Sequence, residues 1–499
     1  MKPLKTLTRR TFIKWSGKAA AIATGLPCIH CGRLNVSRPM TRSFGKLDME
    51  VTTLGLGGQA SIQWTPAGVD PVQIILKAFH LGINYFDTSN LYGPSQMNYG
   101  KAFRRLHLIP GSPDYNERLR RSFFLTSKTH VRFGKGLKTS KGLVNATNGI
   151  AGSTCVDDLR RSLSQIFGDG KGNYPQGAYL DMVLIHSLST PDDLEAVYEG
   201  YDRPDPKSEH IGALAALLDF RDGTNLTGLN PDEETLIRHI GFSGHRSAPL
   251  MMEMIRRDTR HILDGMLVAI NANDRLYLNM QHNVIPVAAA RNMGVIAMKA
   301  FADGAMYSKD AVWSYMPSHV VRSVGSHAVP SRSLIAYALA TTGVHTLITG
   351  IGQISDDSAV CQLTQNLSAA QIRAASLRET DRLAIEDLTA KIKNGKTNYF
   401  QMEAEELSPP RACRIGTEYQ QGREQILITW DTAYAGSEPV VQYDVMRDGQ
   451  KTGQVIHHPQ IDATRFRYAE EKDDTADHVY RIVTVDKKGN RASSDPLRI

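Results

Sequence analysis

The segment LGINYFDTSNLYG (residues 81–93) begins as an apolar run and ends in polar residues. Its first half is typical of a buried strand, because it is short, apolar and rich in residues that favour β structure. Its second half places the carboxyl group of Asp87 and the phenol of Tyr92 directly after that strand. Chemically active side chains at a strand end are typical of α/β barrels, whose sites lie where the strands exit.

The same order, a short apolar run and then a helix-like stretch, repeats along the chain. Eight apolar runs that favour β structure lie near residues 52–57, 83–87, 122–127, 180–185, 238–243, 266–270, 294–298 and 345–349. Most of them are separated by stretches with helical apolar spacing, such as residues 71–82 and 155–168. Eight strands alternating with helices predict a parallel sheet closed into a (β/α)8 TIM barrel, which we place at residues 44–395.

A change of apolar period marks a second domain toward the C-terminus. Around residues 403–414 the helical spacing gives way to strict alternation of apolar and polar residues. Residues 415–499 are therefore predicted to form a small all-β sandwich. Its expected core aromatics are Trp430, Tyr443 and Tyr480. The segment resembles a fibronectin type III module, which implies a spacer or a surface for contact with a protein or glycan.

Composition narrows the classes of function. The chain has 499 residues, too many for one ordinary core, and a net charge of +7 that is modest for its size. Its basic clusters are not interleaved with aromatic residues, so nucleic-acid binding is not favoured. No apolar run is long enough to predict a membrane span. The five cysteines are scattered and odd in number, which predicts neither a disulfide framework nor a metal site.

Residues 1–40 are predicted to be an export signal and linker. The stretch TRRTFIKWSG (residues 8–17) has two adjacent arginines and precedes the weakly apolar AAAIATGLP (residues 19–27). Together they resemble a twin-arginine export signal, which implies a periplasmic or extracellular protein. An ordinary basic tail is the alternative. Lipid attachment at Cys28 is a minor option, because the preceding Pro27 fits a lipoprotein cleavage site poorly.

Polar residues follow most of the predicted strands. In chain order they are Asp87 with Tyr92, Lys128, His186, Ser243, Asn271, Lys299, and then Gly350 with Gly352. Each alone is weak evidence, since a single strand-end acid is usually a turn former. Because parallel strands exit at one rim of a barrel, we expect these groups to converge.

One reaction explains the first four of these groups. A tyrosine holds its proton at neutral pH and can donate it to a carbonyl oxygen as hydride reaches the carbon. An adjacent ammonium, that of Lys128, would lower the pKa of the Tyr92 phenol and stabilise the phenolate. Asp87 would hold Lys128 through an ion pair, and His186 would supply a second donor to the oxygen.

These pieces give the chain a family resemblance. GINYFDTSNLYG, the lysine of FFLTSK, the histidine of LDMVLIH, and HIGFSGH on the fifth strand resemble an aldo/keto reductase over residues 44–392. The resemblance implies a catalytic tetrad with a tyrosine as general acid. Its members here would be Asp87, Tyr92, Lys128 and His186.

The resemblance also implies a nicotinamide dinucleotide, NADP or NAD, along the same rim. Ser243 and Asn271 fall where the family contacts the carboxamide or nearby groups. The stretch GIGQISDDSAV (residues 350–360) follows the last strand and has no cation. Its Gly350, Gly352 and Gln353 could accept a phosphate, whereas Asp356 and Asp357 would repel the adenosine 2′-phosphate. If that phosphate is held elsewhere, Lys299 or Arg373 is the next candidate.

The leading hypothesis is an exported NAD(P)-dependent oxidoreductase acting on a small carbonyl, alcohol or sugar. Because free dinucleotide is scarce outside the cytoplasm, a cofactor loaded before export is one explanation. The alternative is a non-enzymatic barrel that binds or senses a dinucleotide or sugar and contacts a partner through its β domain. The four converging groups favour the enzyme, since a pure binder needs no general acid.

Overall fold

The structure is a computed structural model, and it describes most of the chain beyond the leader. The described residues are 38–136, 146–147, 150–151, 153–322, 329–404, 406–420, 422–472 and 477–499. The predicted export signal lies almost entirely outside them. No helix within these ranges is long and apolar enough to cross a membrane.

A short hairpin covers the N-terminal end of the barrel. Strands β1 (Thr41–Ser43) and β2 (Glu50–Thr52) pair antiparallel. Phe44 follows β1 and is fully buried, with its ring centroid 5.7 Å from that of Tyr85 and 5.2 Å from that of Phe124. Because Tyr85 and Phe124 begin neighbouring strands, the hairpin closes the end of the barrel opposite the strand exits.

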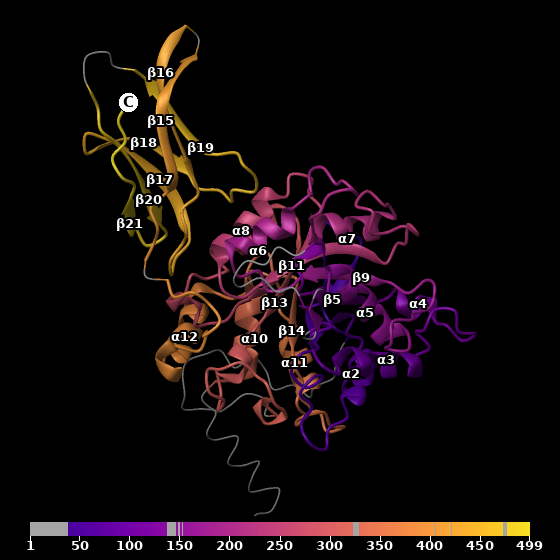
Figure 1. The fold of residues 1–499 in the computed structure, drawn as a ribbon. Coiled ribbons are helices and arrows are strands. Elements are labelled where there is room, and N and C mark those ends of the chain that lie inside the picture. The colour runs from indigo at the N-terminus through magenta and orange to yellow at the C-terminus, as the bar shows by residue number, and fades with distance from the viewer. Residues whose placement is uncertain are drawn as a thin grey trace, which may run out of the picture. The chain divides into compact units, whose positions relative to one another are not determined.

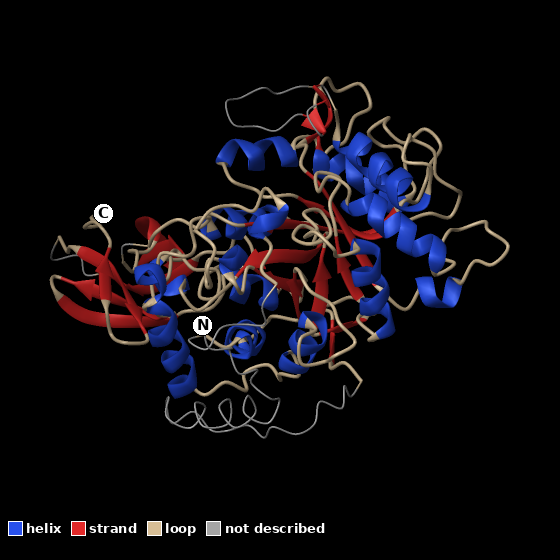
Figure 2. Ribbon diagram, turned by 90° about the horizontal axis from the view of Figure 1, so that it is seen from below, coloured by secondary structure: helices blue, strands red, loops and turns tan. Residues whose placement is uncertain are grey.

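Eight parallel strands close into a barrel in the order β3, β4, β5, β9, β11, β12, β13, β14. Figure 2 shows barrel strands in red with helices in blue around them. Their bounds are β3 Leu54–Gly57, β4 Tyr85–Asp87, β5 Phe124–Thr129, β9 Leu180–Ile185, β11 Ile237–Gly244, β12 Leu263–Ala269, β13 Gly294–Met298 and β14 Thr346–Thr349. Each overlaps one of the eight predicted runs, so the predicted barrel is confirmed.

Helices surround the barrel and connect its strands (Figure 1). They are α2 Pro71–His80, α3 Ser95–Arg105, α4 Glu117–Arg120, α5 Cys155–Phe167, α6 Pro191–Tyr198, α7 Ala213–Asp222, α8 Ala248–Arg257, α9 Val284–Ala290, α10 Ser331–Ala340, α11 Gln362–Ala369 and α12 Glu379–Ala390. Local sequence explains several starts. Thr190 and Asp193 form a reciprocal capping box that begins α6, and Pro191 occupies its first position.

Several short elements lie in the connections between these strands and helices. The 3-10 turns are η1 Asp274–Leu276, η2 Ala302–Gly304, η3 Pro317–His319 and η4 Ile392–Gly395. Two small antiparallel pairs join β6 Phe133–Lys135 to β10 Ile211–Gly212, and β7 Ala146–Thr147 to β8 Ile150–Ala151.

The C-terminal segment forms two antiparallel sheets. One has the order β15, β16, β19, and the other the order β18, β17, β20, β21. Their bounds are β15 Arg411–Gln420, β16 Arg423–Asp431, β17 Val440–Arg447, β18 Gln450–Ile456, β19 Phe466–Glu471, β20 Tyr480–Asp486 and β21 Arg491–Ser493. The predicted aromatics Trp430, Tyr443 and Tyr480 are buried in one cluster with Phe466. The all-β prediction is confirmed, although the first strand begins at Arg411 rather than after residue 415.

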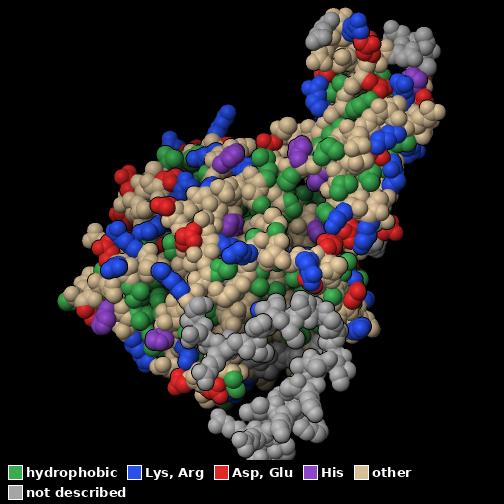
Figure 3. Space-filling view, turned by 180° about the vertical axis from the view of Figure 1, so that it is seen from behind, with side chains coloured by type: hydrophobic (Ala, Val, Ile, Leu, Met, Phe, Trp, Pro, Cys, Tyr) green, Lys and Arg blue, Asp and Glu red, His purple; other side chains and the backbone are tan. Residues whose placement is uncertain are grey.

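Positive and negative side chains are mixed on one face of the molecule. On the face shown in Figure 3, lysine and arginine side chains lie interspersed with aspartate and glutamate side chains. This pattern differs from the continuous basic stripe typical of nucleic-acid-binding surfaces.

Candidate active site

A buried ion pair forms the base of the site. Strand β4 ends at Asp87 and the neighbouring strand β5 carries Lys128. The Lys128 ammonium donates to both carboxylate oxygens of Asp87, at 2.6 and 2.7 Å, and to the carbonyl oxygen of Thr88 at 2.9 Å. These three bonds hold the ammonium in one place, as the sequence predicted.

Tyr92 lies directly above this pair, in a tight turn after β4. Its backbone N–H donates to Ser89 O and its carbonyl accepts from Ser95 N. The Lys128 nitrogen is 4.7 Å from the centroid of the phenol ring, and the ring of His186 lies edge-on at 5.8 Å. The structure therefore brings together all four residues of the predicted tetrad.

The pKa of the Tyr92 phenol is raised well above 10, by burial first and then by the charges of Asp87 and Asp303. This direction is opposite to the lowering expected from Lys128. The reason is that Asp87 compensates the Lys128 charge, while burial disfavours a phenolate. Burial likewise raises the pKa of Asp87 and lowers that of Lys128, each against its partner's charge. Tyr92 consequently holds its proton across the physiological range.

His186 is neutral in these surroundings. Burial lowers its pKa well below 6.5, and the neighbouring His130, Lys128, His245 and Arg132 lower it further. Its Nδ1 atom is buried and has no hydrogen-bond partner among the described residues. A neutral imidazole still offers one N–H donor, which suits a hydrogen bond to a carbonyl oxygen.

A groove runs from this group across the exits of β13 and β14 to helix α11. It holds about 1080 Å³ of empty space, part of which is open to solvent. Among the residues that line it are Gln59, Asp87, Tyr92, His186, His245, Lys299, Phe301, Asp303, Tyr307, His319, Val320, Val321, Gly350, Gln362 and Asn366. Lys299 and Gly350 were predicted to bind the cofactor and do border the groove.

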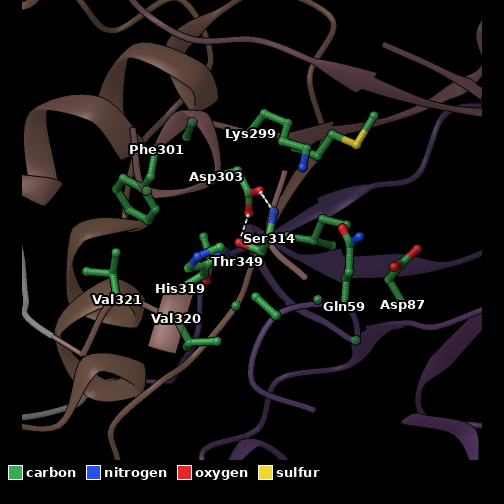
Figure 4. Close-up of a pocket in the computed structure, with 18 of the residues that line it drawn as sticks. Gln59, Asp87, Lys299, Phe301, Asp303, Ser314, His319, Val320, Val321 and Thr349 are labelled. Carbon is green, nitrogen blue, oxygen red and sulfur yellow. Dashed lines mark hydrogen bonds between the residues drawn. The ribbon is translucent and has the colours of Figure 1, made fainter. Parts of the chain in front are cut away.

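Lys299 places its ammonium group at this groove (Figure 4). Its backbone has φ = 65°, a strained value for a residue other than glycine. The ammonium lies 4.4 Å from the centroid of the Trp313 ring, and no carboxylate in the described part of the chain forms an ion pair with it. Burial lowers its pKa, while the charge of nearby Asp303 opposes this.

Asp303 fastens the segment that follows β13. Its carboxylate accepts hydrogen bonds from Ser314 N at 2.8 Å and Ser314 Oγ at 3.1 Å (Figure 4). It also accepts from Tyr399 OH at 3.1 Å and Lys309 Nζ at 3.2 Å. The segment can therefore form one wall of the groove although it contains little regular structure.

Ser243 and Asn271 were also predicted to bind the cofactor, and neither borders the groove. The Ser243 hydroxyl accepts a bond from Ser187 N at 2.9 Å. The Asn271 amide donates to Lys299 O at 3.1 Å and to Asn398 Oδ1 at 2.6 Å. Ser243 lies near the end of β11 and Asn271 lies two residues after β12, as predicted, but each side chain is hydrogen-bonded to another part of the chain.

Backbone groups in the stretch after β14 are likewise hydrogen-bonded within the protein. The backbone N–H groups of Gly352 and Gln353 donate to Gln362 Oε1 at 2.7 and 2.9 Å, so they are not open to a phosphate. Gly352, Gln353 and Asp357 do not border the groove, whereas Gln362 does. The Asp357 carboxylate accepts from the backbone N–H of Ala359.

Cations approach this stretch from other parts of the chain. Arg322 donates to Gln353 Oε1 at 2.6 Å, and Lys77 of helix α2 lies 3.2 Å from Asp356. The sequence of residues 350–360 contains no sign of either. Sequence reasoning also missed Gln59, Tyr307 and His319, which lie outside the barrel strands, and Gln362 and Asn366, which lie on helix α11. Only the fold brings these residues to the groove.

The groove fits a nicotinamide dinucleotide in its chemistry. Besides the Lys299 ammonium, the Tyr307 hydroxyl and the His319 Nδ1 atom are buried without partners among the described residues. Phe301 and Val321 add apolar surface. A cation, uncommitted polar atoms and apolar walls are what an anionic ligand with aromatic rings requires. In the described residues, no cluster of histidine, cysteine or acidic side chains could hold a metal ion.

Comparison with known proteins agrees with this geometry. The model of the aldo/keto reductase family matches residues 53–384. No curated protein matches the chain. Among solved structures, a "putative aldo-keto reductase from Pseudomonas aeruginosa" is 19% identical, with 67% of this chain and 96% of that chain covered and a TM-score of 0.39. A second structure described in similar words, from the same organism, is 19% identical, with 67% and 97% covered and a TM-score of 0.37.

The two structural likenesses are too distant to carry an argument of their own. The family match needs no such support, because it extends over more than half of the chain and includes all eight barrel strands. The chain belongs to the aldo/keto reductase family, whose members generally use NAD(P)H.

Proposed function

We propose that this protein is an NAD(P)-dependent oxidoreductase that interconverts a carbonyl compound and an alcohol. The observation that carries the proposal is the position of Tyr92 at one end of the groove, where its ring lies over the Lys128–Asp87 ion pair and edge-on to the ring of His186. A bound nicotinamide would supply the hydride that reaches the carbonyl carbon.

Residues of the chain then donate a proton and a hydrogen bond to the carbonyl oxygen of the substrate. The Tyr92 hydroxyl donates its proton to the carbonyl oxygen, and an N–H of neutral His186 donates a hydrogen bond to the same atom. The phenolate left on Tyr92 lies over the Lys128 ammonium, 4.7 Å from the ring centroid. Asp87 keeps that ammonium in place, so the stabilising charge is already oriented before reaction.

The cofactor would be held by the residues that border the groove. Lys299 offers charge to a phosphate, Tyr307 and His319 offer hydrogen bonds, and Gly350 borders the groove beside the last strand. NADP and NAD both remain compatible. The acids Asp356 and Asp357 disfavour an added phosphate, whereas Arg322 favours it.

Location and the role of the β domain belong to the same proposal. The twin-arginine-like leader supports export to the periplasm or beyond. The C-terminal sandwich would then serve as a spacer or as a contact surface for a protein or glycan.

One observation favours the non-enzymatic alternative. Ser243, Asn271 and the N–H groups after β14 are all bonded within the protein, which leaves fewer groups for a cofactor. A barrel that only senses a small ligand would not need them.

Binding and turnover separate the two functions. The purified protein is titrated with NADPH and NADH by tryptophan fluorescence, and is then given a panel of aldehydes, ketones and sugars while nicotinamide absorbance is followed. The proposal expects saturable binding of at least one dinucleotide and consumption with at least one carbonyl. Binding without consumption of any carbonyl would favour the sensing barrel.

A further inference from the structure

We infer that Arg132 is a positioning residue that fixes the orientation of His186 by holding the backbone of Ser187. This inference rests on the proposed role of His186 as a hydrogen-bond donor to the substrate. Arg132 itself lies in the connection after β5 and does not border the groove.

Arg132 joins its own connection after β5 to the segment that leads from β9 into helix α6. Its side chain is 1% exposed. The guanidinium donates to His130 O at 3.0 Å, to Ser187 O at 3.1 Å and to the Asp193 carboxylate at 2.8 Å. It therefore ties the exit of β5 to the exit of β9 and to the start of helix α6. A planar fork with several donors is suited to this, and an ammonium is not.

The residue that Arg132 holds is in an unusual conformation. Ser187 directly follows His186 and has φ = 56°, in the left-handed region that serine rarely adopts. Its N–H donates to Ser243 Oγ at 2.9 Å, and its hydroxyl lies 3.2 Å from His245 Nδ1. With Arg132 on its carbonyl oxygen, all three polar groups of Ser187 are bound. Such a conformation persists only where the surroundings determine it fully.

The other end of the Arg132 fork is fixed as well. Asp193 accepts from Ser189 N at 2.9 Å and from Thr190 N at 3.1 Å, besides its bond to Arg132. Burial raises the pKa of Asp193, but its bonds to Arg132 and the backbone give a net lowering, so it is a carboxylate at neutral pH. Arg132 is thus anchored to a helix start rather than to a mobile side chain.

The orientation of the His186 ring depends on this backbone contact, because one of its two ring nitrogens has no hydrogen-bond partner among the described residues. An imidazole that must point one N–H at a substrate is usually oriented by a hydrogen bond to its other nitrogen. In His186 the Nδ1 atom has no partner among the described residues, and the rings of His130 and Tyr92 pack edge-on against it. Orientation must therefore come from packing and from the backbone, which Arg132 holds.

A matched pair at the other end of β9 provides the control. Arg120 is also 1% exposed and donates to the carboxylate of Asp181 at 2.8 Å, near the start of the strand. Its second bond goes to Tyr179 O at 2.9 Å. It has the same chemistry and burial but no link to the strand exits.

The experiment compares Arg132→Lys with Arg120→Lys in the full chain. Both variants keep the charge and lose the fork, so both should lower the melting temperature. We expect only Arg132→Lys to lower kcat, by about a hundredfold, with the KM for dinucleotide changed less than about twofold. In NMR spectra of protein with isotopically labelled histidine, the chemical shift of the His186 ring should change in Arg132→Lys and remain unchanged in Arg120→Lys.

Equal kcat in the two variants, with the His186 signal unmoved, would overturn the inference and leave Arg132 a purely structural residue. If Arg132→Lys does not fold, Asp193→Asn takes its place, with an expected loss of kcat of about tenfold; an unchanged kcat there overturns the inference. Wild-type protein that turns over no carbonyl would defeat the proposed function instead. The His186 signal would still decide whether Arg132 positions that ring.

Discussion

The two ends of strand β9 carry similar buried Arg–Asp pairs in very different surroundings. At the start, Arg120 is paired with Asp181, and its guanidinium lies 3.8 Å from the centroid of the Tyr179 ring. At the exit, Arg132 and Asp193 lie next to the buried Nδ1 atoms of His130 and His186, neither of which has a partner among the described residues.

The difference extends to the neighbouring strands. At the starts of β11 and β12, Asp264 is bonded to both Lys46 and His239, at 2.9 and 3.0 Å. At the exit of β13, the Lys299 ammonium has no carboxylate partner in the described structure. Buried polar groups without partners are costly, so they persist mainly where a ligand or a reaction uses them. The Tyr179 hydroxyl at the start of β9 is also buried without a partner among the described residues, so the contrast is one of charge. The charged groups compared at the starts are paired, whereas Lys299 at the exit is not. This difference favours a stabilising role for the starts and a ligand-binding role for the exit.

The largest expected effect is on the proton donor at the exit. Tyr92→Phe removes only the hydroxyl, so we expect kcat to fall roughly 10²–10⁴-fold. Dinucleotide affinity and melting temperature should stay close to those of wild type. Steady-state kinetics, with fluorescence titration as the control, tests this. A variant that reduces carbonyls at the wild-type rate would remove Tyr92 from the mechanism.

At the start of the strand the effect should be on stability alone. Arg120→Met leaves the buried carboxylate of Asp181 without its close partner, which should cost about 3–5 kcal/mol of unfolding free energy. Denaturant unfolding measures the loss, and Asp181→Asn combined with Arg120→Met should recover most of it. A fall in kcat for the folded variant would show that the start of the barrel is not silent in catalysis.

Asp274 provides a pH-dependent test at the exit. It accepts from Asn271 N and Asn398 Nδ2, and burial raises its pKa to about 8. The folded protein therefore keeps a proton there that the unfolded chain releases near pH 4. Stability should fall as the pH rises toward 8, by at most about 1.4 kcal/mol per pH unit.

Unfolding curves of wild type and Asp274→Asn at several pH values make this measurable. The variant has no titrating group at this position, so its curve should be flatter whatever its absolute stability. Parallel curves would mean that Asp274 is ionised in the folded protein and that the exit tolerates an uncompensated charge.

The smallest expected effect concerns cofactor choice. Asp357 is exposed and does not border the groove, so its charge is screened by solvent. Asp357→Lys should shift the ratio of NADP to NAD affinity toward NADP by about tenfold or less. Arg322→Gln should move it the other way, because Arg322 approaches the same stretch through Gln353. Titration of both dinucleotides decides, and no change in either variant would place the 2′-phosphate elsewhere, with Lys299 or Arg373 as candidates.

Local patterns were enough to predict the strands and the convergence of the four residues of the proposed tetrad. Asp87, Lys128 and His186 follow apolar runs directly, and barrel geometry then brings strand exits together. The sequence predicted where Ser243 and Asn271 lie, but it could not predict their hydrogen-bond partners. Ser187 and Asn398 reach these side chains only in the folded chain. The same holds for Gln362, which occupies the N–H groups after β14.

The predicted direction of the Tyr92 pKa shift was wrong for a related reason. The sequence shows that a lysine is near, but not that the phenol is buried or that Asp87 compensates the ammonium at 2.6 Å. Burial and charge pairing are properties of the packed site, so they lie beyond a reading of motifs.

The central claim is that hydride from a bound nicotinamide dinucleotide is transferred to a carbonyl carbon at the barrel exit, with Tyr92 as the proton donor. The most direct test uses a dinucleotide deuterated at the transferred position, a panel of carbonyl compounds, and mass spectrometry of the alcohols formed. The account predicts one deuterium on the carbinol carbon with wild-type protein and almost none with Tyr92→Phe under the same conditions. Bound dinucleotide with no deuterated alcohol from any compound would contradict it.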